Sequence, residues 1–270
     1  MSAPPASRCV LFPLLVGLGA CSTPVLERPP WEAFQGGQFG LRDVQPVFAL
    51  HENKGEFTGP TVSGGTQPTP PGLIESTTQE DTEPLEPRFG HGVELELFLN
   101  ESWSAGVGAE YRLFDLKDFG PPGLQLQGTP VPVDVGQLET LQYGVWVRHY
   151  LAPFESMPRL RPFLGLSIDW IPEVESDVTL DFSQFAGGQL MLDPARFEGE
   201  DLILARLLVG AAYQWCDSVV LQAGLSFEAP IAPLEGQIEQ PFNEEVGSIF
   251  IDTEMSPRGV LGFLSLTYYP

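Results

Sequence analysis

The sequence is poor in lysine, histidine and cysteine, and its charge is far from balanced. Lys54 and Lys117 are the only lysines, and 13 basic residues stand against 36 acidic ones, which gives a formal net charge of −23. Because blocks of acid repel phosphate, the chain cannot present a basic face to nucleic acid. We therefore expect no nucleic-acid partner.

The sequence also lacks a long hydrophobic run after residue 21. None reaches the roughly 18–20 apolar residues that a transmembrane helix needs. This absence does not exclude a membrane protein, because only every second residue of a barrel strand faces lipid. A soluble all-β domain remains the alternative for short strands at even spacing.

The three cysteines, Cys9, Cys21 and Cys216, are too few for a disulfide framework or a metal cluster. Residues 1–20 have one positive charge and a short apolar segment, which is typical of an export signal. Residues 18–21 read Leu-Gly-Ala-Cys and resemble the lipobox of bacterial lipoproteins. The resemblance implies cleavage before Cys21 and lipidation of its thiol, with an ordinary signal peptide as the alternative. With Cys9 removed and Cys21 modified, we expect no disulfide for Cys216.

From residue 39 onward, short segments that alternate apolar and polar residues predict eight β-strands. Residues 21–38 hold three prolines and two glycines without this alternation, which predicts a flexible tether. Each strand window is long enough to cross a bilayer at a tilt. The windows are 39–50, 89–99, 102–114, 138–151, 159–171, 202–214, 218–229 and 259–270.

The gaps between the windows alternate between short and long, as periplasmic turns and extracellular loops do in outer-membrane barrels. An even number of strands places both chain ends on the periplasmic side, where a lipidated Cys21 could enter the inner leaflet. The four long gaps hold 24 of the 36 acidic residues and five of the 13 basic ones, so we expect four long acidic loops outside the cell. They are 51–88, 115–137, 172–201 and 230–258.

Prolines are nearly absent from the windows. Of 27 prolines, only Pro46, Pro162 and Pro270 fall inside them. Proline cannot donate a ladder hydrogen bond, so this distribution supports the division into strands and loops. Pro46 predicts a bulge in the first strand, or a shorter strand.

Charged residues on the inward face of the strands must pair, since an unpaired buried charge is expensive. Eight strands enclose only enough space for side chains, so we expect a salt-bridged plug, with a gated polar path as the alternative. The predicted lumen charge network comprises Glu94, Glu96, Glu110, Arg112, Arg148, Arg161, Asp169, Arg206 and Glu228.

Apolar residues occupy the other face of the windows, which would contact lipid. A soluble barrel would turn this face inward. Outward aromatic residues fall near both strand ends, as expected for two girdles at the membrane interfaces. The predicted girdle residues are Trp103, Tyr213 and Tyr268 on the short-turn side and Tyr111, Tyr143, Trp170 and Phe227 on the long-loop side.

Two stretches carry a family resemblance: GVGAEYR at residues 106–112 and RPFLGL at residues 161–166. They resemble the small outer-membrane barrel superfamily, which includes the transmembrane domain of outer membrane protein A and the eight-stranded virulence and adhesion barrels. The resemblance implies an all-β, eight-stranded antiparallel up-and-down transmembrane β-barrel over residues 39–270. It also implies a monomer in the outer membrane of a Gram-negative-type bacterium, with membrane lipid, lipopolysaccharide and the assembly machinery as partners. The chain departs from the family by ending in Tyr269-Pro270 instead of an aromatic residue.

The histidines give no sign of an enzyme. Acyl hydrolysis needs a nucleophile that is activated by a histidine, and His51, His91 and His149 have no serine two residues away on their strands. We expect no catalytic residue, no cofactor and no metal site. The acidic clusters lack EF-hand spacing, so we expect solvated charge, with divalent-cation binding as the alternative.

These features predict a non-enzymatic outer-membrane barrel with a structural or surface-interaction role, in which the long acidic loops bind an extracellular ligand. One alternative is a narrow, porin-like pore for small solutes. Another is a lipid-tethered soluble β-barrel that binds an apolar ligand.

Overall fold

The structure is a computed structural model, and the part of the chain that it describes is all-β. No helix within that part is long and apolar enough to cross a membrane. The predicted signal peptide and the lipidation site at Cys21 lie outside the described residues. These are residues 26, 29–32, 34, 36–64, 74–75, 83–115, 125–126, 129–130, 133–135, 137–180, 195–241 and 247–270.

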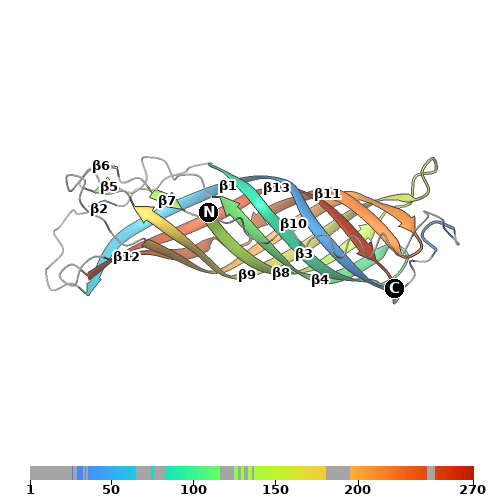
Figure 1. Ribbon diagram of the computed structural model, residues 1–270, viewed down its shortest axis with the longest axis horizontal. Helices are drawn as coiled ribbons and strands as arrows, with labels where there is room; N and C mark the ends of the chain where they lie inside the picture. Colours follow the sequence, from blue (N-terminus) through green and yellow to red (C-terminus); the bar gives the residue numbers. More distant parts are fainter. Residues whose placement is uncertain are drawn as a thin grey trace, which may run out of the picture.

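Eight long antiparallel strands close into a barrel (Figure 1), which confirms the predicted fold class. Closure comes from the first and last strands, which pair from Leu41 with Tyr268 to Gly64 with Gly247. All eight predicted windows fall on these strands. In order around the barrel they are β1 (Phe39–Gly64), β3 (Glu83–Phe98), β4 (Trp103–Asp115), β8 (Gln137–Tyr150), β9 (Leu160–Leu180), β10 (Ala195–Cys216), β11 (Val219–Pro230) and β13 (Gly247–Tyr268).

The strands run much further on the long-loop side than the sequence predicts. β10 and β13 each have 22 residues, about twice the roughly 9–11 that cross a bilayer. β12 (Leu234–Pro241) pairs with both of them and continues the course of β11. Much of the gap 230–258, and parts of 51–88 and 172–201, are therefore strand, so the prediction of loops there is wrong.

Four short strands lie at the same end of the barrel as β12 (Figure 1). One of them extends the barrel wall by pairing with β9, and the other three form a small separate sheet. They are β7 (Val133–Val135) in the wall, and β2 (Ile74–Glu75), β5 (Gln125–Leu126) and β6 (Thr129–Pro130) in the small sheet.

Prolines interrupt the strand pairing without ending the strands. The pairing of β1 with β13 shifts register between Pro46 and Phe48, which confirms the predicted bulge. A second shift lies between Thr58 and Thr61 of β1, on either side of Pro60. Bulges leave a residue without a ladder partner, so a proline can remain within a continuous strand.

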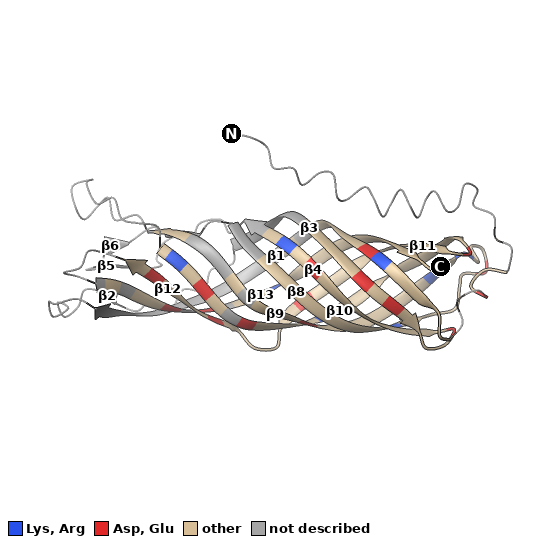
Figure 2. Ribbon diagram, turned by 60° about the horizontal axis from the view of Figure 1, so that its bottom comes forward, with Lys and Arg blue, Asp and Glu red and all other residues tan. Residues whose placement is uncertain are grey.

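Beyond Trp170 the apolar face of the wall turns inward and the polar face turns outward. At this level the indole N–H of Trp170 donates to Asp201 over 2.7 Å. From there on, the exposed described residues of β10, β12 and β13 are polar and mostly acidic, and acidic residues follow β12 in Figure 2. The buried inner side chains are Val174, Val178, Ala195, Phe197, Leu234, Ile238 and Ile251. The exposed outer ones include Arg196, Glu198, Glu235, Gln237, Glu239, Asp252 and Glu254. This part, which we call the distal barrel, is built like a soluble barrel.

The segment just before β1 folds into the opposite mouth of the barrel. Trp31 donates its backbone N–H to Oε1 of Gln214 over 2.6 Å and its indole N–H to the carbonyl of Pro158 over 3.0 Å. The predicted flexible tether 21–38 is therefore wrong for this segment, because hydrogen bonds to Gln214 and Pro158 at the rim hold it in the mouth.

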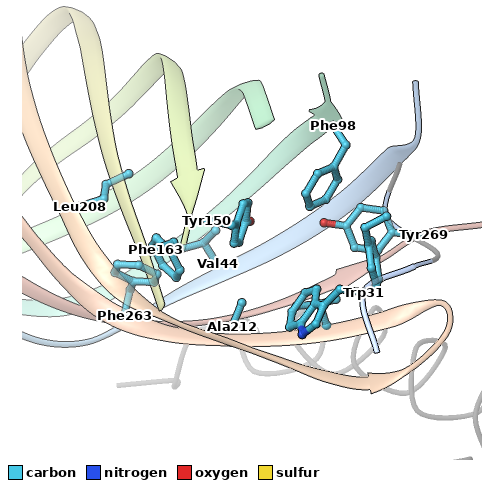
Figure 3. Packing of buried hydrophobic residues seen from close by; sticks show 11 residues of the cluster. Trp31, Val44, Phe98, Tyr150, Phe163, Leu208, Ala212, Phe263 and Tyr269 are labelled. Atoms are coloured by element: carbon cyan, nitrogen blue, oxygen red, sulfur yellow. The ribbon is translucent and has the colours of Figure 1, made fainter. Parts of the chain in front are cut away.

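Aromatic rings from both ends of the chain close this mouth. Phe34 is fully buried and its ring lies 4.7 Å from that of Tyr269, centroid to centroid. The ring of Phe98 lies 5.4 Å from that of Tyr150 and 5.8 Å from that of Tyr269, and Figure 3 shows these rings together with Trp31. We call this group the mouth stopper, and it consists of Trp31, Phe34, Phe98, Tyr150 and Tyr269.

Candidate functional site

A belt of apolar side chains covers the outer wall between the short turns and the distal barrel. Leu95, Val107, Val145, Leu166 and Ile168 are each more than half exposed. Large exposed apolar patches mark contact with a membrane or a partner. The apolar face of these strands points outward, as the sequence predicts.

The predicted girdle residues lie at the two edges of this belt. At the outer edge, the rings of Tyr143 and Trp170 lie 6.1 Å apart on neighbouring strands. At the short-turn edge, Trp103 lies against His149, with 4.5 Å between ring centroids. The other four predicted girdle residues lie on the long strands and are Tyr111 on β4, Tyr213 on β10, Phe227 on β11 and Tyr268, the last residue of β13.

Inside the barrel, the first charge cluster lies directly above the mouth stopper and centres on Glu96. This carboxylate is fully buried and pairs with Arg42. The hydroxyls of Ser104, Tyr150 and Tyr269 donate to it over 2.6, 2.9 and 2.5 Å. One buried charge thus ties β1, β4, β8 and the C-terminal residues together.

Glu94 belongs to the same cluster, one inward position further along β3. Arg42 and Arg148 both donate to its Oε2, over 2.7 and 3.2 Å. The Arg148 guanidinium also lies 4.0 Å from the centroid of the Trp146 ring, in a cation–π contact.

The second charge cluster lies closer to the distal barrel. Arg112 donates to Glu110 over 2.7 Å and to Glu228 over 2.8 Å, and uses both of its terminal nitrogens. Arg206 forms a two-pronged pair with Asp169 and lies 3.3 Å from Glu110 and 3.5 Å from Glu228. Such forked pairs are the strongest arrangement of these groups.

The membership of the network differs from the predicted set at two arginines. Arg161 lies apart from both clusters, because it donates to the backbone carbonyls of Glu101, Tyr150 and Leu151. Arg42, which the sequence analysis did not select, takes its place. Its position on the inward face of window 39–50 would have identified it. The other eight predicted residues lie in the two clusters, so five carboxylates face four guanidiniums.

Side chains fill the space between the clusters. A Cβ atom at Gly106 would collide with Trp146, and one at Gly144 would collide with Asp169, so only glycine fits at these two positions. Two cavities between the clusters have volumes of about 20 Å³ each. That is close to the space one water molecule needs, so neither cavity admits a solute.

The side chains of His91 and His149 lie outside the lumen. Nδ1 of His91 lies 3.2 Å from Oδ1 of Asp43, and both residues alternate with lumen-facing neighbours. The sequence analysis did not pair them, because they are far apart along the chain. Within the described residues, no group of three His, Cys, Asp or Glu side chains could hold a metal ion.

Cys216 is disulfide-bonded, which contradicts the expectation that it has no partner. Cys9 and Cys21, the other two cysteines, lie outside the described residues. The expectation rested on the assumption that export removes Cys9 and lipidates Cys21.

No protein-family model matches the chain, and no curated protein matches it. Among solved structures, the outer membrane protein OprG from Pseudomonas aeruginosa is similar, with 11% identity and a TM-score of 0.48 over 88% of this chain and all of that one. Outer membrane protein AlkL in lipid bilayers has 14% identity and a TM-score of 0.41, over 91% of this chain and 96% of that one.

The outer membrane protease OmpT from Escherichia coli is similar to the same extent. It has 9% identity and a TM-score of 0.41, over 87% of this chain and 94% of that one. All three of these solved proteins are outer-membrane proteins.

Proposed function

We propose that the chain is a non-enzymatic outer-membrane β-barrel that holds a rigid acidic structure above the membrane surface. The observation that carries this proposal is the exchange of faces along one continuous wall. An apolar exterior around a charged interior is stable only in lipid, and a charged exterior around an apolar interior is stable only in water. The boundary between the two environments therefore falls beside Trp170 and Asp201.

The proposal places a partner at each level of the wall. Lipid would contact the apolar belt, and lipopolysaccharide would surround the outer girdle and the base of the distal barrel. The acidic outer face of the distal barrel would meet an extracellular ligand. Each of the eight long strands pairs on both sides, which is consistent with a monomer.

The filled lumen argues against the pore alternative, because side chains occupy the barrel from the mouth stopper to the second charge cluster. The exposed apolar belt argues against the soluble, lipid-tethered alternative. We expect purified protein in planar bilayers to show no steady conductance.

Cysteine labelling in intact cells tests the topology, with Cys216→Ser as the background. A membrane-impermeant maleimide should label Glu235→Cys on the distal barrel of intact cells. It should label Ser156→Cys, in the turn between β8 and β9, only after the outer membrane is opened. Leu166→Cys in the belt should resist it in both conditions. Equal labelling of all three in intact cells would contradict the proposal.

We also propose a lipid anchor on Cys21. An alkyne analogue of palmitate should label the exported protein, and Cys21→Ser should abolish the label. Exported protein that stays unlabelled would contradict the anchor.

A further inference from the structure

Glu94 lies where two small cavities of the lumen meet. Each cavity has a volume of about 20 Å³ and is bordered by Glu94, Glu110 and Arg206. Arg42 and Arg148 both donate to the same oxygen of Glu94, Oε2, which leaves Oε1 for another partner. Every other carboxylate of the network accepts hydrogen bonds on both of its oxygens.

Two further polar atoms in one of these cavities lack partners. Oε1 of Gln142 and Nε1 of Trp146 are buried and have no hydrogen bond from the described residues. Gln142 is fixed in this orientation, because its amide nitrogen donates to Glu110 over 2.9 Å. One water could accept from Trp146 and donate to Gln142, and the cavity has the volume that one water requires.

The charges of the network do not balance. Within the two charge clusters five carboxylates face four guanidiniums, because the fifth buried guanidinium, that of Arg161, binds backbone carbonyls at the mouth. The clusters therefore carry one negative charge in excess, which is expensive when it is buried without compensation. We propose that the cavity beside Glu94 is a binding site for one water and one proton. The proton is carried on Oε1 of Glu94, which donates to the water held between Gln142 and Trp146.

This arrangement goes beyond the proposed function. The proton neutralises the excess negative charge, and the water gives the unpaired polar atoms of the cavity hydrogen-bond partners. Four carboxylates of the clusters then face four guanidiniums, and Oε1 of Gln142 and Nε1 of Trp146 each gain a partner. Glu94 is the member of the set whose second oxygen is open. The charged groups around it are its donors Arg42 of β1 and Arg148 of β8, its neighbour Glu96 on β3, and Glu110 of β4, Asp169 of β9 and Arg206 of β10, which border the cavities.

Infrared spectroscopy of the full-length protein, folded in detergent at neutral pH, tests the proposal. The wild type should show the carbonyl stretch of a protonated carboxylic acid, and Glu94→Gln should lose it. Glutamine reproduces the neutral side chain, so Glu94→Gln should change the unfolding rate by less than about threefold. The matched control, Glu228→Gln, should unfold at least roughly a hundredfold faster, because it removes a buried negative charge that pairs with both Arg112 and Arg206.

The opposite pattern would overturn the proposal. If Glu94 is ionised, the wild type lacks the carbonyl stretch, and Glu94→Gln destabilises the barrel as much as Glu228→Gln does. If sodium supplies the missing positive charge, the stretch is again absent, and sodium chloride slows unfolding of the wild type relative to choline chloride. The wild-type spectrum alone decides the matter if Glu94→Gln does not fold.

Discussion

Arg112 and Arg196 show how the same side chain has different roles on the two sides of the wall. Arg112 is buried between Glu110 and Glu228, and both of these depend on it for a positive charge. Arg196 is exposed on the distal barrel, 3.4 Å from Glu198. Buried pairs are costly to break, whereas exposed pairs are screened by water and salt.

We therefore expect Arg112→Leu to lower the free energy of unfolding by about 3–5 kcal/mol, because it leaves two buried carboxylates with less compensation. Arg196→Leu should lower it by less than about 1 kcal/mol. Denaturant titration of the barrel in lipid vesicles measures both. Equal losses for the two variants would contradict a buried, paired network.

At this scale the sequence predicts which residues face inward but not which of them pair. Period-two alternation places Glu94 and Glu110 in the lumen without any structure. Alternation cannot place Arg161, because its guanidinium turns toward backbone carbonyls at the mouth. Nor can it assign Glu96 to Tyr269, which lies 173 positions away along the chain.

All eight long strands are predicted from the sequence, but the positions at which they end on the distal side are not. All eight were found, because the membrane part of each alternates cleanly between apolar and polar residues. The distal extensions of these strands are acidic and rich in proline, and this composition predicts loops. Bulges accommodate prolines within paired strands, and an acidic outer face is compatible with a strand in water.

A positive charge placed on the wall should distinguish the membrane part of a strand from its distal part. Leu166→Arg lies in the belt on β9 and should lower the stability of the folded barrel in vesicles by about 2–4 kcal/mol. Gln237→Arg, on the outer face of β12, should change it by less than about 0.5 kcal/mol, as expected of an exposed surface position. If both variants are tolerated equally, the belt does not face lipid.

The contacts of the mouth stopper predict that Trp31 and Phe34 hold the segment before β1 in the mouth of the barrel. Trp31→Ala together with Phe34→Ala removes the rings that hold this segment, so protease should cleave between residues 26 and 38 in detergent. The barrel should stay closed, because its strand pairing does not depend on either ring. Trp103→Ala, which removes an outward ring, is the control and should leave the segment protected. Protection in the double variant would show that other contacts hold the segment.

At the scale of the whole molecule, one continuous barrel wall would contact lipid in its membrane part and water in its distal part. The membrane part carries its charges inside and its apolar residues outside, and the distal barrel does the reverse. The sequence predicts the membrane part from its alternation of outward apolar and inward charged residues. It predicts loops for the distal barrel, because the residues there are acidic and rich in proline. Neither pattern alone identifies a ligand, so the acidic outer face of the distal barrel is the surface to probe for one.

The central claim is that the chain forms a closed barrel within a membrane, and its behaviour in membrane fractions tests this most directly. Cells that express the chain should yield it in the outer-membrane fraction, resistant to extraction with carbonate. The unboiled protein should then migrate differently from the boiled protein in a denaturing gel, because a closed barrel stays folded in the detergent until it is heated. Release by carbonate, with one mobility before and after boiling, would contradict the account.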